Sequence, residues 1–260
     1  MSGTAHIARR WVAGNLRSLV SVAVIIVAWE AVARLRLAPP LFLPSPSAVV
    51  SRFVDLVADG SLPADLALSL MRTFAGLALA MTAGVILGIA MVRNRPLHWL
   101  FDPLVSLGFP SPKIAFIPVF VLWFGIDSLS KILLVAFACV FPVVIATYDA
   151  ARGVRRTIIW SAASLGTSRR RLMWRVLLPA CQPRIFAALR VAIPVALITT
   201  FTSEMVAGGG GMGASLMYAQ RFFESPTVYA YIVVMLVMGL VFDKAMLMLR
   251  DRIPAWRDEG

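Results

Sequence analysis

Six long apolar runs dominate this sequence and limit what it can fold into. A helix needs about 20 mostly apolar residues to cross the hydrocarbon core of a bilayer. The runs that meet this requirement are about Leu16–Ala33, Thr73–Val92, Leu100–Phe124, Ile132–Tyr148, Ile185–Val206 and Val228–Leu249. Only 15% of the 260 residues are charged, whereas about one quarter of a soluble domain is charged. The sequence therefore predicts an all-α polytopic membrane protein with six transmembrane helices.

The first run could also be a secretory signal peptide, because arginines precede it and Ala31-Val32-Ala33 resembles a cleavage site. However, the run is long for a signal peptide, and Glu30 lies where a cleavage region is normally neutral. We therefore expect a retained first helix, in which Glu30 pairs with Arg34 one turn further on.

Basic residues between the runs predict the side of the membrane on which each loop lies. Arginines gather before the first run, between the second and third, between the fourth and fifth, and after the sixth. These segments all lie on one side if six helices alternate, and the positive-inside rule makes that side cytoplasmic. We therefore expect a cytoplasmic N-terminal segment at 1–15, a membrane domain at 16–250 and a cytoplasmic tail at 251–260. Because topology accounts for the net charge of +12, no nucleic-acid partner is expected.

The connection between the first two runs is rich in proline at its start. Proline fixes φ and lacks an N–H donor, so residues 39–46 are expected to be extended. Ser47 is expected to cap a short amphipathic helix that follows. This helix could lie on the membrane surface or contact a partner.

The connection between the fourth and fifth runs, residues 150–184, carries eight arginines and no Asp or Glu. It could pair with anionic lipid headgroups, but topology signalling alone needs far fewer residues. The local sequence predicts two short helices over residues 155–165 and 169–178. Gly166 suits the C-terminal cap of the first, Thr167 or Ser168 can cap the second, and Pro179 is expected to end it. We therefore favour a docking element.

The spacing of Gly166, Val176 and Leu178-Pro179 resembles the signature of a loop in the membrane subunits of bacterial ABC importers of the binding-protein-dependent type. In that family the loop forms a coupling helix that docks into a groove of the ATPase subunit. The family signature begins Glu-Ala-Ala, where this sequence has Trp160-Ser161-Ala162. The resemblance implies an ATPase-coupling surface centred on Leu165 and Gly166. Its residues are Trp160, Ser161, Ala162, Ala163, Leu165, Gly166, Thr167, Ser168, Arg169 and Pro179.

Other stretches resemble the nitrate/sulfonate/taurine-like group of these permeases. They are LPSPSAVVSRF (43–53), SLMRTFAGLALAMTAGVILG (69–88), SPKIAFIPVFVLWFGIDSLSKI (111–132) and FPVVIATYDAARGV (141–154). The resemblance implies a fold like the transmembrane domain of type I ABC importers, in the bacterial inner membrane.

The same resemblance implies a function and a set of partners. The chain would be a permease subunit, not an enzyme, and would form the translocation path for a small solute such as sulfonate, nitrate, taurine or a similar anion. The expected partners are cytoplasmic ABC ATPase subunits that bind ATP and Mg, a second permease copy in a homodimer, a periplasmic substrate-binding protein, and membrane lipid. The main alternative, a stand-alone secondary transporter or channel, would need carboxylates within its spans, and the second to fourth runs have none at mid-depth.

Residues 208–213, GGGGMG, formally match a dinucleotide-binding pattern. That motif requires a preceding strand and an acidic residue about 20 positions further on, whereas an apolar run precedes these glycines and position 233 is Val. A flexible loop on the outer side is the better interpretation. The sequence also contains no P-loop pattern, which the separate ATPase would supply.

A few polar residues and prolines fall at the end of, or inside, the apolar runs. The candidates for a translocation path are Pro118, Pro142, Thr199, Thr202, Ser203 and Glu204. Threonines can bond back to carbonyls of their own helix, so we favour that role for them and a functional role for Glu204. The two prolines, together with Pro194, can each kink a span.

Overall fold

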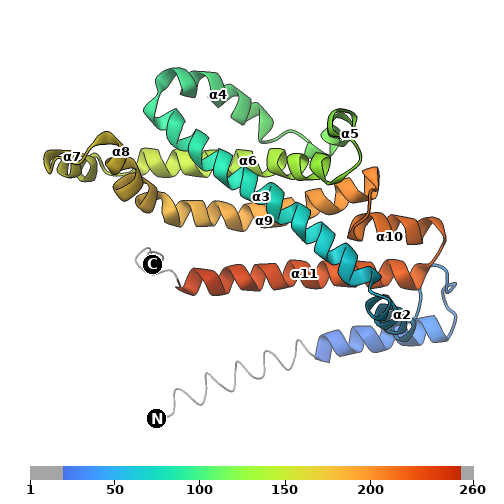
Figure 1. The fold of residues 1–260 in the computed structure, drawn as a ribbon. Helices are drawn as coiled ribbons and strands as arrows, with labels where there is room; N and C mark the ends of the chain where they lie inside the picture. The colour runs from blue at the N-terminus through green and yellow to red at the C-terminus, as the bar shows by residue number, and fades with distance from the viewer. Residues whose placement is uncertain (1–19, 253–260) are drawn as a thin grey trace, which may run out of the picture. The chain divides into compact units, whose positions relative to one another are not determined.

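Every regular element in residues 20–252 of the computed structural model is a helix (Figure 1). The structure describes these residues, except for the side chains at 156, 159, 163, 169, 170 and 250–252. Within this range the chain forms two compact units, a smaller one at 20–62 with 216–234 and a larger one at 63–215 with 235–252. The all-α expectation is confirmed for the described residues.

The smaller unit is built on a helix at residues 20–34 and on α2 (Pro46–Ala58). The expected pair on the first helix is confirmed, because Nε of Arg34 lies 2.5 Å from Oε1 of Glu30. Glu30 also accepts hydrogen bonds from the backbone N–H of Ser47 at 3.1 Å and from its hydroxyl at 2.8 Å. These bonds attach the start of α2 to the first helix.

The amphipathic helix expected after the proline-rich segment is present, but the predicted cap is wrong. Ser45, not Ser47, is the N-cap, and its Oγ accepts a hydrogen bond from the N–H of Ala48 at 3.3 Å. The expected extended segment is only partly present. The N–H of Phe42 donates to the carbonyl of Pro39 at 2.9 Å, which makes a turn of its first residues, whereas Ser45 is extended with φ −69° and ψ 143°.

Four helices of the described residues are long and apolar enough to cross a membrane. They are α3 (Ser61–Arg93), α6 (Ser128–Gly153), the stretch Met173–Ala207 that ends in α9 (Leu178–Ala207), and α11 (Ser225–Arg252). Each contains one of the predicted apolar runs. The first predicted span begins before residue 20 and so lies partly outside the described residues, and the count of six spans stays a prediction.

The third predicted span, Leu100–Phe124, is not one straight helix. It consists of α4 (Arg95–Gly108), a 3-10 turn η1 (Lys113–Phe116) and α5 (Ile117–Phe124), and the chain bends by 103° between α4 and the helices after it. If this bent pair is one span, the described residues contain five spans.

Two prolines and a lysine account for the bend. Pro110 and Pro112 lie between the two halves, and proline can neither donate a helical hydrogen bond nor follow a helical residue easily. The Nζ of Lys113 then donates to the carbonyls of Gly108 at 2.5 Å and Phe109 at 2.6 Å. The lysine thus adds a donor to carbonyls at the end of α4, where helical donors run out.

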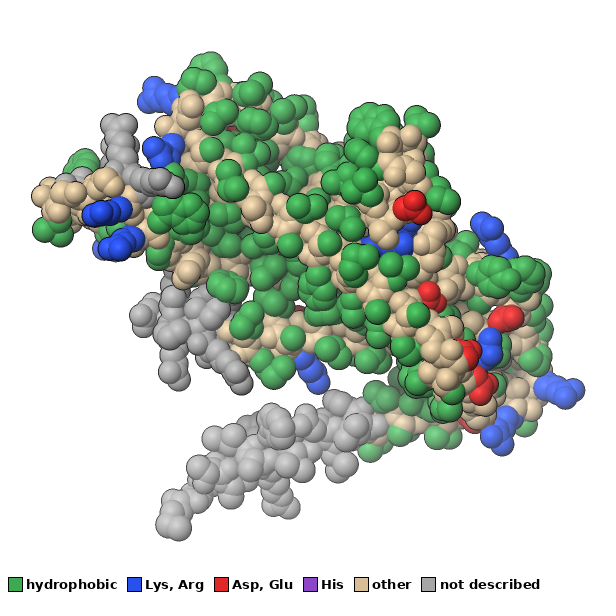
Figure 2. Space-filling model, viewed as in Figure 1, with side chains coloured by type: hydrophobic (Ala, Val, Ile, Leu, Met, Phe, Trp, Pro, Cys, Tyr) green, Lys and Arg blue, Asp and Glu red, His purple; other side chains and the backbone are tan. Residues whose placement is uncertain are grey.

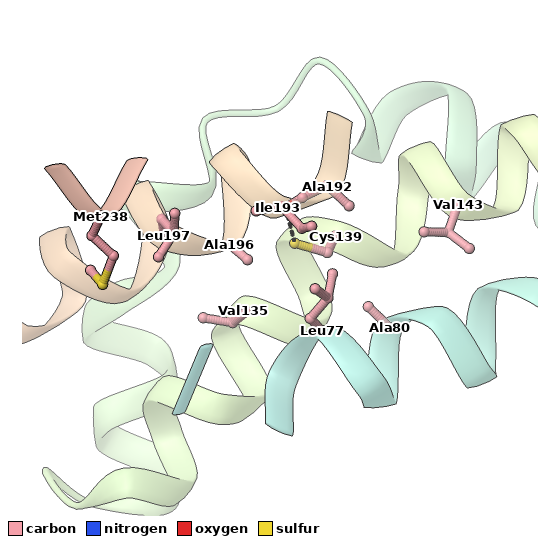
Figure 3. Packing of buried hydrophobic residues seen from close by; sticks show 10 residues of the cluster. All are labelled: Leu77, Ala80, Val135, Cys139, Val143, Ala192, Ile193, Ala196, Leu197 and Met238. Atoms are coloured by element: carbon pink, nitrogen blue, oxygen red, sulfur yellow. Dashed lines mark hydrogen bonds between the residues drawn. The ribbon is translucent and has the colours of Figure 1, made fainter. Parts of the chain in front are cut away.

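The core of the larger unit lies between α3, α6 and α9 (Figure 3). The cluster consists of Leu77, Ala80, Val135, Cys139, Val143, Ala192, Ile193, Ala196, Leu197 and Met238 of α11. The Sγ of Cys139 donates to the carbonyl of Ala192 at 3.4 Å, which joins α6 to α9. Small residues on α9 allow this close contact between helix backbones.

Glycines on one face of α3 allow a similarly close approach to α6. A Cβ placed on Gly76 would lie 2.6 Å from Cβ of Val135, and one on Gly84 would lie 2.7 Å from Cγ1 of Val143. Real Cβ atoms do not approach so closely, so these positions require glycine. Small residues at helix interfaces are typical of membrane proteins, where packing replaces the hydrophobic effect.

The surface of the protein is largely apolar. Figure 2 shows hydrophobic side chains over most of the visible face, with Lys and Arg side chains around α7 (Arg156–Ser164) and α8 (Arg169–Leu172). Leu122 is 82% exposed, and Leu236 and Leu240 of α11 are each 64% exposed. Such large exposed apolar surfaces indicate contact with lipid or with partner subunits.

Candidate functional site

The basic loop 150–184 contains two short helices that meet at Gly166, as the sequence predicts. Gly166 follows α7 with a φ of +77°. The N–H of Thr167 donates to the carbonyl of Ala162 at 3.2 Å, the long-range bond of a Schellman cap. After α8 the chain passes into a π-helical turn, η2 (Met173–Leu177), and from there into α9.

The structure decides between the two predicted caps and corrects the predicted end of the second helix. Ser168 caps α8, because its Oγ accepts from the N–H of Arg171 at 3.4 Å and its carbonyl accepts from the N–H of Leu172 at 2.9 Å. Pro179 does not end the second helix; it lies in the first turn of α9. The proline coincides with a change from π to α geometry, so the loop leads into the span through continuous helix.

The tip of this loop exposes apolar side chains among arginines. Leu165 is 86% exposed and Trp160 is 63% exposed, and nothing lies within 4 Å of a Cβ placed on Gly166. The other predicted coupling residues with described side chains are exposed or half-buried: Ser161, Ala162, Thr167, Ser168 and Pro179. The side chains of Ala163 and Arg169 lie outside the described part. An apolar tip with a polar rim is the composition of a protein interface.

The predicted path residues at the end of α9 are largely enclosed within the larger unit. Thr199 and Ser203 are buried, and Thr202 is half-buried. Ser203 donates to the carbonyl of Thr200 at 2.8 Å, so its hydroxyl is satisfied by its own helix.

The prolines predicted inside spans fall into two groups. Pro142 and Pro194 lie inside α6 and α9, as expected. Pro118 lies in the first turn of α5, where the missing N–H would have no helical partner in any case. Pro118 therefore marks a helix start and not a kink.

Glu204 pairs with Arg72 of α3, and the pair is buried. Oε1 of Glu204 lies 2.8 Å from Nη1 of Arg72, and the two side chains are 0% and 2% exposed. Sequence reasoning missed Arg72, although a signal existed. A single arginine and a single glutamate at the same expected depth of two spans are candidates for a pair, because an unpaired buried charge is very unfavourable.

The glycine loop, residues 208–211, has a defined shape, which corrects the expectation of a flexible loop. The φ angles of its four glycines lie between +68° and +96°. A Cβ on Gly211 would lie 2.4 Å from Oε1 of Glu204, and one on Gly213 would lie 2.4 Å from the carbonyl of Phe201. Close packing against α9 therefore requires glycine at these positions.

Comparison with known proteins identifies the family of this chain. Residues 80–254 match the family described as "Binding-protein-dependent transport system inner membrane component". The chain belongs to that family. It is 33% identical to the taurine transport system permease protein of Escherichia coli, over 93% of this chain and 90% of that protein. The expected group of ABC importer permeases is confirmed.

Other relatives of this permease are named for different solutes. It is 30% identical to a protein described as an aliphatic sulfonates transport permease in Bacillus subtilis, over 94% of this chain and 89% of that protein. It is also 30% identical to the formylaminopyrimidine transport permease protein of Halalkalibacterium halodurans, over 90% of this chain and 92% of that protein.

The fold of this permease resembles that of a solved importer. It matches an inward-facing structure of the MetNI methionine ABC transporter with a TM-score of 0.62, over 73% of this chain and 94% of that chain, at 16% identity. The expected type I importer fold is therefore confirmed. The family match also confirms that the chain is an ABC transporter permease. The segment that matches the family contains the basic loop and Glu204 and begins after Arg72.

Proposed function

We propose that this chain is the permease subunit of an ATP-driven importer, in which the loop around Gly166 docks onto a cytoplasmic ATPase. The observation that carries the proposal is the exposed apolar tip of the basic loop, in a chain of this family. Leu165 and Trp160 project from a segment whose charged residues are all arginines. Water alone would not favour exposed apolar groups there, so a protein partner that covers them gives the better account.

The partners follow from the family, whose members work as the membrane component of binding-protein-dependent systems. The ATPase subunits would bind ATP and Mg, two copies of this chain would form the path as a homodimer, and a periplasmic binding protein would deliver the solute. The arginine distribution supports cytoplasmic termini and a cytoplasmic basic loop in the bacterial inner membrane. Closure of the ATPase dimer would then move the loop and, through it, α9.

The proposed cargo is a small sulfonate or a similar anion. The support is the similarity to permeases named for taurine and for aliphatic sulfonates. The identity to a formylaminopyrimidine permease, 30%, is lower than the 33% to the taurine permease and equal to that to the aliphatic sulfonates permease of Bacillus subtilis. Uptake of radiolabelled taurine, in competition with alkanesulfonates, nitrate and formylaminopyrimidine, ranks these candidates directly.

The experiment that tests the coupling loop compares two glycine variants. Gly166 and Gly60 have φ of +77° and +80°, and a Cβ on either meets nothing within 4 Å. Gly166→Ala and Gly60→Ala therefore carry similar backbone strain, of about 1–2 kcal/mol, in different loops. We expect Gly166→Ala to lower the yield of co-purified ATPase and the rate of solute uptake severalfold, and Gly60→Ala to leave both unchanged.

Two results would contradict the proposal. One is equal ATPase recovery and uptake for the two alanine variants and for a bulkier Gly166→Trp variant. The other is purification of the tagged protein without any ATPase, even after crosslinking, combined with uptake driven by an ion gradient. The second result would favour the stand-alone secondary transporter.

A further inference from the structure

The buried pair of Arg72 and Glu204 has more partners than an isolated ion pair. The Nε of Arg72 donates to the hydroxyl of Ser128 at 3.0 Å, at the start of α6. Its Nη1 donates to the carbonyl of Gly210 at 2.8 Å as well as to Glu204, and its Nη2 donates to the carbonyl of Gly209 at 2.7 Å. The guanidinium therefore joins α3, α6, α9 and the glycine loop. We name Ser69, Arg72, Ser128 and Glu204 the Arg72 cluster.

The carboxylate of Glu204 connects the same cluster to the start of α10 (Met212–Arg221). It accepts from the N–H of Gly213 at 3.1 Å and from the hydroxyl of Ser69 at 2.8 Å. The hydroxyl of Ser69 in turn accepts from the N–H of Met212 at 2.9 Å. Two N–H groups at the start of α10 are thus satisfied by the Arg72 cluster, and they have no helical partners of their own.

A second carboxylate strengthens this attachment. Asp65 of α3 accepts from the hydroxyl of Ser215 at 2.5 Å and from the N–H of Gly211 at 3.2 Å. Charged hydrogen bonds of this kind are about twice as strong as neutral ones. The glycine loop and the first turn of α10 are therefore held to α3 and α9 by hydrogen bonds to charged groups on both sides.

The Arg72 cluster is a joint and not an open anion site. Four of the five N–H donors of Arg72 are already used by protein oxygens. The nearby buried cation, Lys131, donates its Nζ to the carbonyls of Ile126 and Asp127. Since the donors are occupied, the cluster is built to hold the loop and not to receive a solute.

Continuous helix connects this cluster to the basic loop at the other end of α9. The helix has 30 residues, which at 1.5 Å per residue is about 45 Å. It begins directly after η2, which follows α8 of the basic loop. Glu204 lies in its last turn, so a displacement of α9 reaches the Arg72 cluster.

We propose that Arg72 and Glu204 are positioning residues that make the glycine loop and the first turn of α10 follow the outer end of α9. This inference rests on the proposed function, in which the ATPase moves the opposite end of the same helix. Through the Arg72 cluster the movement reaches the face on which a binding protein would dock, and docking there acts back on the ATPase. Such coupling is reciprocal by thermodynamic necessity.

The test separates positioning from simple stabilisation with a double variant. Removing one partner of a buried pair leaves an unpaired buried charge and strongly destabilises a protein, whereas replacing both partners by apolar residues is often neutral. Arg72→Met with Glu204→Leu should therefore fold and assemble, although the carbonyls of Gly209 and Gly210 lose their donor. The matched control is Arg190→Met with Asp243→Leu, which removes an exposed pair 3.8 Å apart that also involves α9.

The measurement is ATP hydrolysis by the complete complex in lipid nanodiscs, with and without the co-purified binding protein. For the double variant of the Arg72 cluster we expect basal hydrolysis within about twofold of the unmodified complex and at least a fivefold loss of stimulation by the binding protein, a typical size for coupling between sites. The control double variant should keep its stimulation.

The inference would be overturned if the binding protein stimulated ATP hydrolysis equally in the apolar double variant and in the unmodified complex, because the pair would then only stabilise the fold. If that variant does not assemble, the same stimulation is measured on Arg72→Lys. Lysine keeps the charge but not the planar set of donors, so reduced stimulation supports positioning and full stimulation refutes it. An unmodified complex that shows no stimulation would overturn the proposed function itself, and this inference with it.

Discussion

Replacing Gly211 by alanine tests whether the glycine loop is shaped by Glu204. The φ of Gly211 is +96°, a conformation that costs alanine about 1–2 kcal/mol. The new Cβ would also lie 2.4–2.7 Å from the three carboxyl atoms of Glu204. The carboxylate must therefore move, and each charged hydrogen bond that it loses costs about 1.5–3 kcal/mol. With one such bond lost, the free energy of unfolding falls by about 4 kcal/mol.

Gly210→Ala is the matched control for this prediction. Gly210 has a φ of +76°, and its Cβ would approach only Cδ2 of Leu68, at 3.2 Å, which a flexible side chain can avoid. Alanine there should cost only the backbone strain, about 1–2 kcal/mol. The difference between the two variants thus isolates the contact with Glu204.

Thermal unfolding in mild detergent measures this difference. A thiol-reactive dye reports unfolding, because Cys139 and Cys181 are free and buried. In a protein of this size 1 kcal/mol corresponds to about 2–4 °C. We therefore expect a midpoint lower by roughly 8–16 °C for Gly211→Ala and by roughly 2–8 °C for Gly210→Ala. Equal shifts for the two variants would refute the argument that Glu204 shapes the loop.

Two further substitutions test the packing and capping of individual helices. Gly76→Ala should destabilise the protein by about 1–3 kcal/mol through overpacking, because its Cβ would lie 2.6 Å from that of Val135. A Cβ on Gly239 would meet no atom within 4 Å, so Gly239→Ala should instead stabilise α11 by about 0.5–1 kcal/mol. In the same dye assay the unfolding midpoint should therefore fall for Gly76→Ala and rise for Gly239→Ala. Ser45→Ala removes the hydroxyl that caps the N–H of Ala48 and should weaken α2 by about 1 kcal/mol. Faster amide hydrogen exchange in the first turn of α2 measures that loss, and unchanged exchange would contradict the cap.

The long apolar helices could be predicted because a membrane span depends on composition alone. Each of the four long helices contains one of the predicted runs, although α3 and the stretch Met173–Ala207 each begin 12 residues before their run. The bend between α4 and α5 could not be found in this way, because the mean hydropathy of a long apolar window does not reveal the effect of Pro110 and Pro112 on the backbone. The rule that proline ends a helix failed at Pro179, because a π-helical turn directly before it changes the local geometry.

The two sites differ in how far the sequence alone predicts them. The cap at Gly166 is local: it needs a glycine after a helical stretch, and the bonds that form it span five residues. The pair of Arg72 and Glu204 joins residues 132 positions apart, so it depends on which helices pack together. Glu204 could be singled out as a costly charge in an apolar run. Arg72 lies at a matching depth, but only the structure shows that the two residues pair.

The two ends of α9 are held by different kinds of contact. At one end Glu204 is buried and paired, and separating such a pair costs about 3–5 kcal/mol. At the other end the helix continues through η2 into a loop whose tip residue, Leu165, is 86% exposed. Interior prolines, Pro183 and Pro194, provide points at which the helix can bend. Leu177 and Cys181 at the loop end are buried against α3 and α6, so a partner that pulls on the loop moves a packed end of α9, and the Arg72 cluster moves as one body with the other end.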